Sequence, residues 1–217
     1  MNESTSPLAP PTDSGQIVTD LDQQLLAFNA LALASLEKWD IDPGSKLSLI
    51  KHRENAVYEL MTPDGGRYAL RIHRAGYHSD AALRSELQWM SALNAAGLLT
   101  PQSVKTRTND WFAVLQEGTS GERYQVDMLS WVDGKALGSV EQGLSDDVAT
   151  LAANYRQVGV LAARLHKLTE SWPKPEGFTR HAWDIDGCFA EHAVWGRYRD
   201  LEVLTPEQMA TLDAASE

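Results

Sequence analysis

Arg71 and Glu86 are charged residues in positions where a charge is normally costly, and together they could form a buried ion pair. Arg71 lies in residues 67–73, Arg-Tyr-Ala-Leu-Arg-Ile-His, where apolar side chains alternate with polar or small ones. Because successive side chains of a strand point to opposite faces, Arg71 shares one face with Ala69, and the opposite face is apolar. The segment therefore predicts a strand that presents a cation beside a small residue.

Glu86 belongs to a predicted helix over residues 80–96. At about 100° per residue, Glu86 falls inside the apolar arc that also contains Leu83 and Leu87. A carboxylate on a packing face needs a cation nearby, because an unpaired buried charge is strongly destabilising. The nearest candidate in the sequence is Arg71. Such a pair is either architectural or part of a functional site, and the spacing alone leaves both alternatives open.

The segments around this pair predict an α+β chain. Alternating apolar residues predict five strands, at residues 46–51, 56–61, 67–73, 111–117 and 123–132. A tight turn at residues 63–66, Pro-Asp-Gly-Gly, joins the second and third strands as a hairpin. Periodicity at three and four residues predicts helices at residues 19–39, 80–96, 145–170, 186–195 and 206–217, of which the long third helix is expected to be buried.

The domain organisation follows from changes in composition along the chain. Residues 1–16 are rich in Ser, Thr, Pro and Asp and predict a disordered tail. Residues 17–136 predict an N-terminal lobe made of the leading helix and the sheet, and residues 137–217 a partial helical C-terminal lobe. A hinge between the two is expected at residues 138–143.

Composition excludes several classes of function. With 19 basic and 30 acidic residues the 217-residue chain has a formal net charge of −11, which argues against a general nucleic-acid binder. There is no apolar run long enough to span a bilayer, and the residues before Lys38 lack the basic residues of a secretory or transit signal. The single cysteine, Cys188, cannot form an internal disulfide, and no His or Cys spacing indicates zinc. We therefore expect a soluble, cytoplasmic protein.

Several motifs occur in the order found in one family. Five strands, a helix after the third, Ala-x-Arg on that strand and a Glu on the helix resemble the small lobe of a protein-kinase-like fold. More closely, the chain resembles the aminoglycoside phosphotransferase family, including its homoserine-kinase-like branches. The segments that carry this resemblance are residues 54–58, 70–74, 76–79, 130–134, 165–166 and 183–187. It extends over about residues 47–195.

The resemblance implies a site for ATP, with magnesium as a second cofactor. Arg71 would hold the α- and β-phosphates and Glu86 would orient it. The loop at residues 52–56, which contains Asn55, would cover the phosphates. The partners implied are a nucleotide and a small-molecule hydroxyl substrate of the kind used by aminoglycoside, homoserine or choline kinases.

The same resemblance implies an adenine pocket at the edge of the sheet. Ala69 would cover the adenine ring, and Leu129 would lie at the back of the pocket. Ser130 and Val132 would offer a backbone carbonyl and a backbone amide to the adenine edge.

The sequence departs from the family pattern at three points. The phosphate loop at residues 52–56 lacks the glycines of a protein kinase. Arg71 stands where the family usually has lysine, and the two cations differ in shape and in donor geometry. The His-Gly-Asp-x-x-x-x-Asn segment and the following Asp-x-Asp, which supply the catalytic aspartate and the magnesium ligands, do not occur in residues 1–217. No catalytic or metal-ligating residue is therefore predicted here. We expect a nucleotide-binding portion of a phosphotransferase with little activity alone, and self-association through exposed helical surface.

Alternatives remain beside this interpretation. The chain could be a non-catalytic nucleotide-binding or protein-interaction module derived from the same fold. His73, Arg74 and His78 could meet phosphate or belong to a solvated loop. Asp184 and Asp186 could bind a metal, but a helix cap and a surface charge are the more common roles of two isolated carboxylates.

Overall fold

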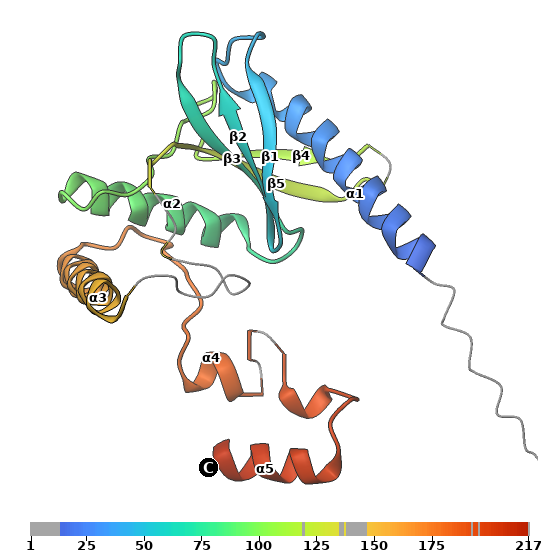
Figure 1. Ribbon diagram of the computed structural model, residues 1–217, viewed down its shortest axis with the longest axis vertical. Coiled ribbons are helices and arrows are strands. Elements are labelled where there is room, and N and C mark those ends of the chain that lie inside the picture. The colour runs from blue at the N-terminus through green and yellow to red at the C-terminus, as the bar shows by residue number, and fades with distance from the viewer. Residues whose placement is uncertain are drawn as a thin grey trace, which may run out of the picture. The chain divides into compact units, whose positions relative to one another are not determined.

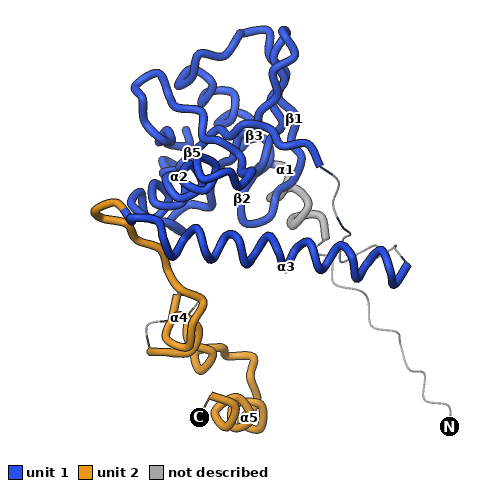
Figure 2. The backbone as a smooth tube through the Cα atoms, turned by 90° about the vertical axis from the view of Figure 1, so that its left-hand side faces the viewer, with its two compact units in different colours: residues 1–174 blue, residues 175–217 orange. Residues whose placement is uncertain are grey.

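The computed structural model divides into two compact units, residues 1–174 and 175–217, shown in different colours in Figure 2. The structure describes residues 14–118, 120–134, 137, 147–191, 193–194 and 196–216. The predicted hinge at residues 138–143 lies outside the described residues, so the division into lobes at residue 137 stays a prediction. The two compact units instead separate after Lys174.

A five-stranded antiparallel sheet forms the centre of the first unit (Figure 1). Its strands are β1 (Lys46–His52), β2 (Asn55–Met61), β3 (Arg67–His73), β4 (Ala113–Gln116) and β5 (Arg123–Ser130). Their order across the sheet is β1-β2-β3-β5-β4. The predicted α+β class and the five strands with a helix inserted after the third are thus confirmed, although β4 is shorter than the predicted residues 111–117.

The hairpin between β2 and β3 forms as the Pro-Asp-Gly-Gly segment predicts. The amide of Thr62 donates to the carbonyl of Gly66 at 2.9 Å, and the amide of Gly65 donates back to Thr62 at 3.0 Å. Gly65 has a φ of +90°, a conformation in which a Cβ atom would be strained. The tight turn fixes the register in which Val57 lies opposite Arg71.

Helix α2 (Asp80–Ala95) follows β3 and is capped at both ends. The hydroxyl of Ser79 accepts a hydrogen bond from the amide of Ala82 at 3.1 Å, which satisfies one of the free amides of the first turn. Gly97, with a φ of +81°, ends the helix in the left-handed conformation typical of this position.

The first residue of α2 is also tied to the sheet. The two carboxylate oxygens of Asp80 accept hydrogen bonds from Gln125 Nε2 and Arg123 Nη2 of β5, each at 2.6 Å. The hydrogen bond from Arg123 holds the pKa of this carboxyl below its usual range, although burial acts in the opposite direction. The start of α2 is therefore fixed relative to β5.

Each face of the sheet packs against a different helix. Helix α1 (Ser14–Ser35) covers one face, and the buried apolar residues there include Phe28, Leu31, Trp39, Tyr58, Leu60, Leu70, Ile72, Val126 and Met128. The opposite face carries a smaller cluster made of Leu83, Leu87, Phe112 and Leu129, which joins the sheet to α2. The larger core holds α1 against the sheet. The polar residues described below lie on the opposite face, beside the smaller cluster that contacts α2.

Helix α1 begins earlier than predicted. It starts at Ser14, so residues 14–16 belong to the helix, and residues 1–13 of the predicted tail lie outside the described residues. The backbone is already helical before residue 19, where the predicted helix begins. A 3₁₀ turn, Leu36–Lys38, follows α1 and leads to Trp39.

Helix α3 (Val148–Ser171) forms where predicted, and Asp147 caps its first turn. It lies next to α2, since Trp89 Nε1 donates to Thr169 Oγ1 at 3.0 Å. The prediction that this helix is buried is wrong for the described chain, because none of its residues is buried and Tyr155 and Leu161 are 56% and 51% exposed. None of the described helices is long and apolar enough to cross a membrane.

In the second unit the described residues include helix α4 (Ile185–Phe189), a 3₁₀ turn (Tyr198–Asp200) and helix α5 (Pro206–Ser216). Tyr198 Oη and Arg199 Nε both donate to Asp213 Oδ1, at 2.7 and 2.8 Å, and connect the preceding turn to α5. Asp184 caps α4 by accepting from the amide of Gly187 at 2.8 Å, which accounts for one of the two carboxylates considered for a metal. Within the described part of the chain, no group of three or more His, Cys, Asp and Glu side chains could hold a metal ion.

Candidate functional site

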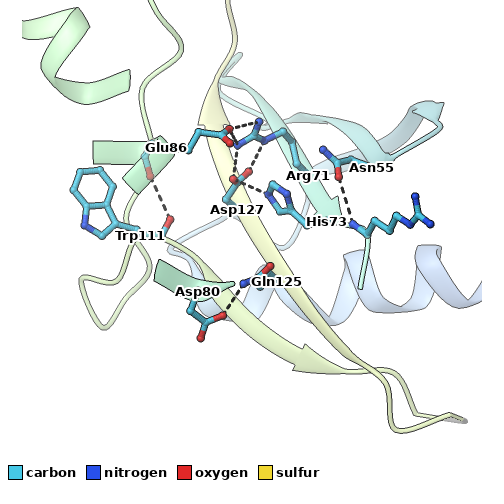
Figure 3. A network of polar contacts seen from close by, with 10 residues as sticks. Asn55, Arg71, His73, Asp80, Glu86, Trp111, Gln125 and Asp127 are labelled. Carbon is cyan, nitrogen blue, oxygen red and sulfur yellow. Dashed lines mark hydrogen bonds and ion pairs between the residues drawn. The ribbon is translucent and has the colours of Figure 1, made fainter. Parts of the chain in front are cut away.

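The polar face of β3 and β5 contains the residues that the sequence singled out. In the antiparallel register Arg71 lies opposite Asp127, and Ala69 lies opposite Leu129. Because side chains alternate along each strand, all four belong to the face that packs against α2. Figure 3 shows Arg71, Asp127 and Glu86 meeting between the sheet and the helix.

Arg71 and Asp127 form a two-point ion pair. Nε of Arg71 donates to Oδ1 of Asp127 at 2.8 Å, and Nη2 donates to Oδ2 at 2.6 Å. The side chain of Asp127 is completely buried and that of Arg71 is 18% exposed. Two parallel hydrogen bonds between a guanidinium and a carboxylate fix both the position and the plane of the guanidinium.

The predicted pair between Arg71 and Glu86 is present. Nη1 and Nη2 of Arg71 both donate to Oε1 of Glu86 at 3.2 Å. Glu86 is 20% exposed, and its bonds to Arg71 are longer than those made by Asp127. The guanidinium thus lies between a buried carboxylate on the sheet and a less buried one on α2.

His73 completes the network. Its Nε2 atom lies 3.0 Å from Oδ2 of Asp127, and its side chain is only 3% exposed. Because an ionised carboxylate can only accept hydrogen bonds, Nε2 carries the hydrogen. His73 therefore neither lies in a solvated loop nor is free to bind phosphate, and both alternatives considered for it are wrong. It is buried because the alternation along β3 places its side chain on the face that packs against α2.

The network changes the proton affinities of both central groups. Burial alone would raise the pKa of Asp127, but the charge of Arg71 and hydrogen bonds from His73 and Arg71 hold the pKa well below its usual range. For Arg71, burial alone would lower the pKa, and the carboxylates of Asp127 and Glu86 raise it above its usual range instead. Both groups are therefore charged at neutral pH.

This arrangement predicts a pH dependence of stability. A carboxyl whose pKa is lower in the folded than in the unfolded chain stabilises the fold above its unfolded pKa, which is about 3.9 for Asp. That contribution is lost as the pH falls toward the lower, folded pKa. We expect the difference in unfolding free energy between the wild type and Asp127→Asn to be largest near pH 7 and to narrow below pH ~4.

Urea unfolding at several pH values measures this difference. Asp147→Asn is the matched control, because Asp147 is an exposed N-cap whose pKa is also lowered, and asparagine caps a helix about as well. The unfolding free energy of Asp147→Asn should differ less from the wild type near pH 7 than that of Asp127→Asn, because Asp147 is fully exposed to solvent. An Asp127→Asn difference that is the same at pH 3 and pH 7 would contradict the prediction.

The residues expected around an adenine ring lie next to the network. Ala69 packs against the apolar cluster that contains Leu129, which is 4% exposed. Ser130 ends β5, and its amide donates to the carbonyl of Gln102 at 2.8 Å. Val132 follows, 40% exposed, and its amide has no hydrogen bond to another described residue. The two backbone groups expected to bind adenine, the Ser130 carbonyl and the Val132 amide, thus lie directly after Leu129, which pairs with Ala69.

Trp131, between Ser130 and Val132, is fixed against β3. Its amide donates to the carbonyl of Arg67 at 3.2 Å, and the Arg67 guanidinium lies 4.1 Å from the centre of the indole ring. Arg67 also donates to Asp133 Oδ1 at 3.1 Å. The segment after β5 is therefore held to the start of β3 on both sides of Trp131.

Asn55 lies at the start of β2, opposite His73 in the register. Its side-chain Oδ1 accepts from the amide of Arg74 at 3.4 Å, as Figure 3 shows. This bond connects the end of the loop before β2 to the end of β3. Alternation along β2 places Asn55 on the same face as Val57, the partner of Arg71.

The sequence did not single out Asp127 as part of this site. The signal was a carboxylate in the middle of an apolar strand, between Val126 and Met128, which is as unusual as Glu86 on an apolar helix face. The charge of Glu86 indicates a nearby cation, Arg71, but it does not indicate the second carboxylate that this cation binds. Gln125, two residues before Asp127 in β5, is a second polar residue on the same face of the sheet.

Comparison with known proteins supports the family resemblance. The model of the phosphotransferase enzyme family (APH) matches residues 46–215, from the start of β1 into α5. The chain belongs to this phosphotransferase family. No curated protein sequence gives a significant match.

Two solved structures resemble this member of the phosphotransferase family. One is a microcompartment-associated aminopropanol kinase, with a TM-score of 0.69 and 25% identity, matched over 86% of this chain and 54% of that protein. The other is the amicoumacin kinase hAmiN, in complex with AMP-PNP, Ca²⁺ and Ami, with a TM-score of 0.61 and 16% identity over 94% of this chain and 54% of that protein. The chain thus spans about half the length of both kinases, and the predicted kinase-like fold is confirmed.

Proposed function

We propose that this chain is the nucleotide-binding portion of an ATP-dependent phosphotransferase that acts on a hydroxyl group of a small molecule. The observation that carries the proposal is the Arg71–Glu86 pair, which joins β3 to α2 beside Ala69 in a chain of the phosphotransferase family. Kinases of this general fold use such a pair to place a cation on the nucleotide phosphates. The amicoumacin kinase was solved with AMP-PNP, which supports a nucleotide as the ligand.

Each site residue has a role in this proposal. Arg71 contacts the phosphates through the N–H of Nη1 that binds neither carboxylate, and Glu86 orients the guanidinium. The loop that ends at Asn55 covers the phosphates. These residues bind and orient the nucleotide, and magnesium would neutralise part of the phosphate charge when bound.

The adenine ring would lie under Ala69, with Leu129 behind it. The Ser130 carbonyl would accept from the exocyclic amine, and the Val132 amide, which has no partner among the described residues, would donate to a ring nitrogen. Trp131 and Arg67 hold this segment in place. The acceptor molecule is not specified by these residues, and the cytoplasmic location stays a prediction.

Nucleotide binding to the chain tests the proposal. Magnesium ADP at 100 times its dissociation constant should stabilise the fold by about 2.7 kcal/mol, because a ligand that binds only the folded state shifts the unfolding equilibrium. Differential scanning fluorimetry would detect this as a higher melting temperature. In Ala69→Leu the larger side chain fills the space proposed for adenine, so the shift should disappear. In Ala95→Leu, an exposed position at the end of α2, it should remain. A wild-type chain that shows no shift at millimolar nucleotide would overturn the proposal.

Catalytic turnover separates the enzyme portion from a purely binding module. Residues 1–217 contain no His-Gly-Asp-x-x-x-x-Asn segment, so we propose that the chain alone hydrolyses or transfers little phosphate. A coupled assay that detects robust ATP consumption, abolished in Ala69→Leu, would contradict this part of the proposal. Binding without turnover would agree with it.

A further inference from the structure

Asp127 occupies a position that neither the pattern of the sequence nor the Arg71–Glu86 pair explains. It lies directly opposite Arg71 in the β3–β5 register, is fully buried, and receives two hydrogen bonds from the guanidinium and one from His73. A buried carboxylate on the sheet would be unnecessary if Arg71 needed only Glu86 as its partner. Asp127 connects the guanidinium of Arg71 on β3 to the neighbouring strand β5.

We propose that Asp127 is a positioning residue for nucleotide binding, which holds the Arg71 guanidinium in place before a ligand arrives and makes arginine rather than lysine the fitting cation at this position. The inference rests on the proposed function, because it concerns the cation that would contact the nucleotide phosphates. Asp127 itself does not contact the nucleotide; it acts through Arg71.

The donors of Arg71 divide between the two carboxylates. Of the five N–H groups of a guanidinium, one on Nε and one on Nη2 bind Asp127, while Nη1 and the second N–H of Nη2 bind Glu86. One N–H of Nη1 has no partner among the described residues. The guanidinium thus keeps a donor for a phosphate oxygen while both carboxylates are satisfied.

A lysine cannot reproduce this arrangement. One ammonium nitrogen at the position of Nη2 would reach Asp127 Oδ2 and Glu86 Oε1, but Oδ1 of the fully buried Asp127 would lose its donor. A buried acceptor without a donor is costly, so the ammonium would be drawn toward Asp127 and away from Glu86 and the phosphates. The aspartate therefore favours arginine at position 71.

The position of the guanidinium also affects ligand binding. A long side chain that is already fixed loses less conformational freedom when the nucleotide binds. Removing the charge of Asp127 should release this constraint while Glu86 still holds the other end. Binding of magnesium ADP should therefore be about 2–10-fold weaker in Asp127→Asn, the range expected for immobilising one such side chain.

Isothermal titration with magnesium ADP on the full chain tests the inference through a rescue. Arg71→Lys should bind roughly 10-fold or more weakly, because a charge-assisted contact is misplaced. The double variant Arg71→Lys/Asp127→Asn should bind more tightly than Arg71→Lys, since the lysine is no longer drawn to a buried charge. Arg107→Lys, which changes an exposed arginine paired with Asp40, is the control and should bind like the wild type.

The outcomes separate the two proposals. If the wild-type chain does not bind magnesium ADP, the proposed function fails and this inference with it. If the wild type binds but the double variant is no tighter than Arg71→Lys, or Asp127→Asn binds like the wild type, only the inference is overturned. A purely structural role of Asp127 would change the melting temperature of the variants without this rescue.

A second measurement needs no Asp127 variant to fold. In a ¹⁵N–¹H spectrum of the wild type without nucleotide, the Nε–H of Arg71 should exchange slowly with water, because it is hydrogen-bonded to a buried carboxylate. The signal is assigned by its loss in Arg71→Lys. Exchange as fast as that of the exposed arginines would show that the guanidinium is not held before the ligand binds, and would overturn the inference.

Discussion

Replacing Arg71 with leucine is expected to lower the free energy of unfolding of the first unit by about 3–5 kcal/mol, the range for removing one partner of a buried ion pair. The reason is that Asp127 has no exposed side-chain surface and would lose two hydrogen bonds and its counterion together. Glu86 would lose its Arg71 bonds as well. Urea unfolding followed by circular dichroism at pH 7 measures the change.

Arg74→Leu is the matched control for this substitution. Arg74 also forms an ion pair, with Glu54 at 3.0 Å, but the two side chains are 63% and 68% exposed. Exposed pairs contribute about 0–1 kcal/mol, so this variant should differ little from the wild type. If Arg71→Leu costs no more than Arg74→Leu, the buried network does not stabilise the fold as described.

Trp39→Ala is expected to destabilise the chain by a similar amount, about 3–5 kcal/mol. Trp39 is 1% exposed in the core between α1 and the sheet, and its Nε1 atom donates to the carbonyl of Val104 at 2.9 Å. The substitution removes a large apolar side chain and leaves that carbonyl without its donor. Chemical unfolding monitored by far-ultraviolet circular dichroism would measure the loss.

Trp183→Ala provides the comparison, because Trp183 is 76% exposed and lies in the second unit. Exposed substitutions usually change stability by less than about 0.5 kcal/mol. A Trp39→Ala variant as stable as Trp183→Ala would mean that the core around Trp39 contributes little to the stability of the first unit.

Local patterns predicted most of the sheet and the first contact of the site. The alternation in residues 67–73 reproduces β3 to the residue, since a strand with one buried face repeats every two residues. Glu86 on an apolar helix face correctly indicated Arg71, because a buried charge needs a partner. Both inferences use residues close to one another in the sequence.

Features that depend on distant pairing were missed. Asp127 is 56 residues from Arg71 along the chain, and only the order β3-β5 in the sheet brings them together. Strand order and register depend on the whole set of interactions and cannot be derived from one strand. The exposure of α3 was missed for a related reason: an apolar stripe predicts a packing face, but the stripe does not say whether a partner is present.

The two connections of α2 to the sheet affect how its position could be regulated. Asp80 ties its first residue to β5, and Glu86 ties its second turn to β3 through Arg71. A regulator that acted by pulling this helix away would have to compensate for the loss of both connections. Converting a population from 1% to 99% displaced requires roughly 10⁴-fold tighter binding to the displaced state. Displacement of α2 is therefore accessible only to an effector that discriminates strongly between the two states.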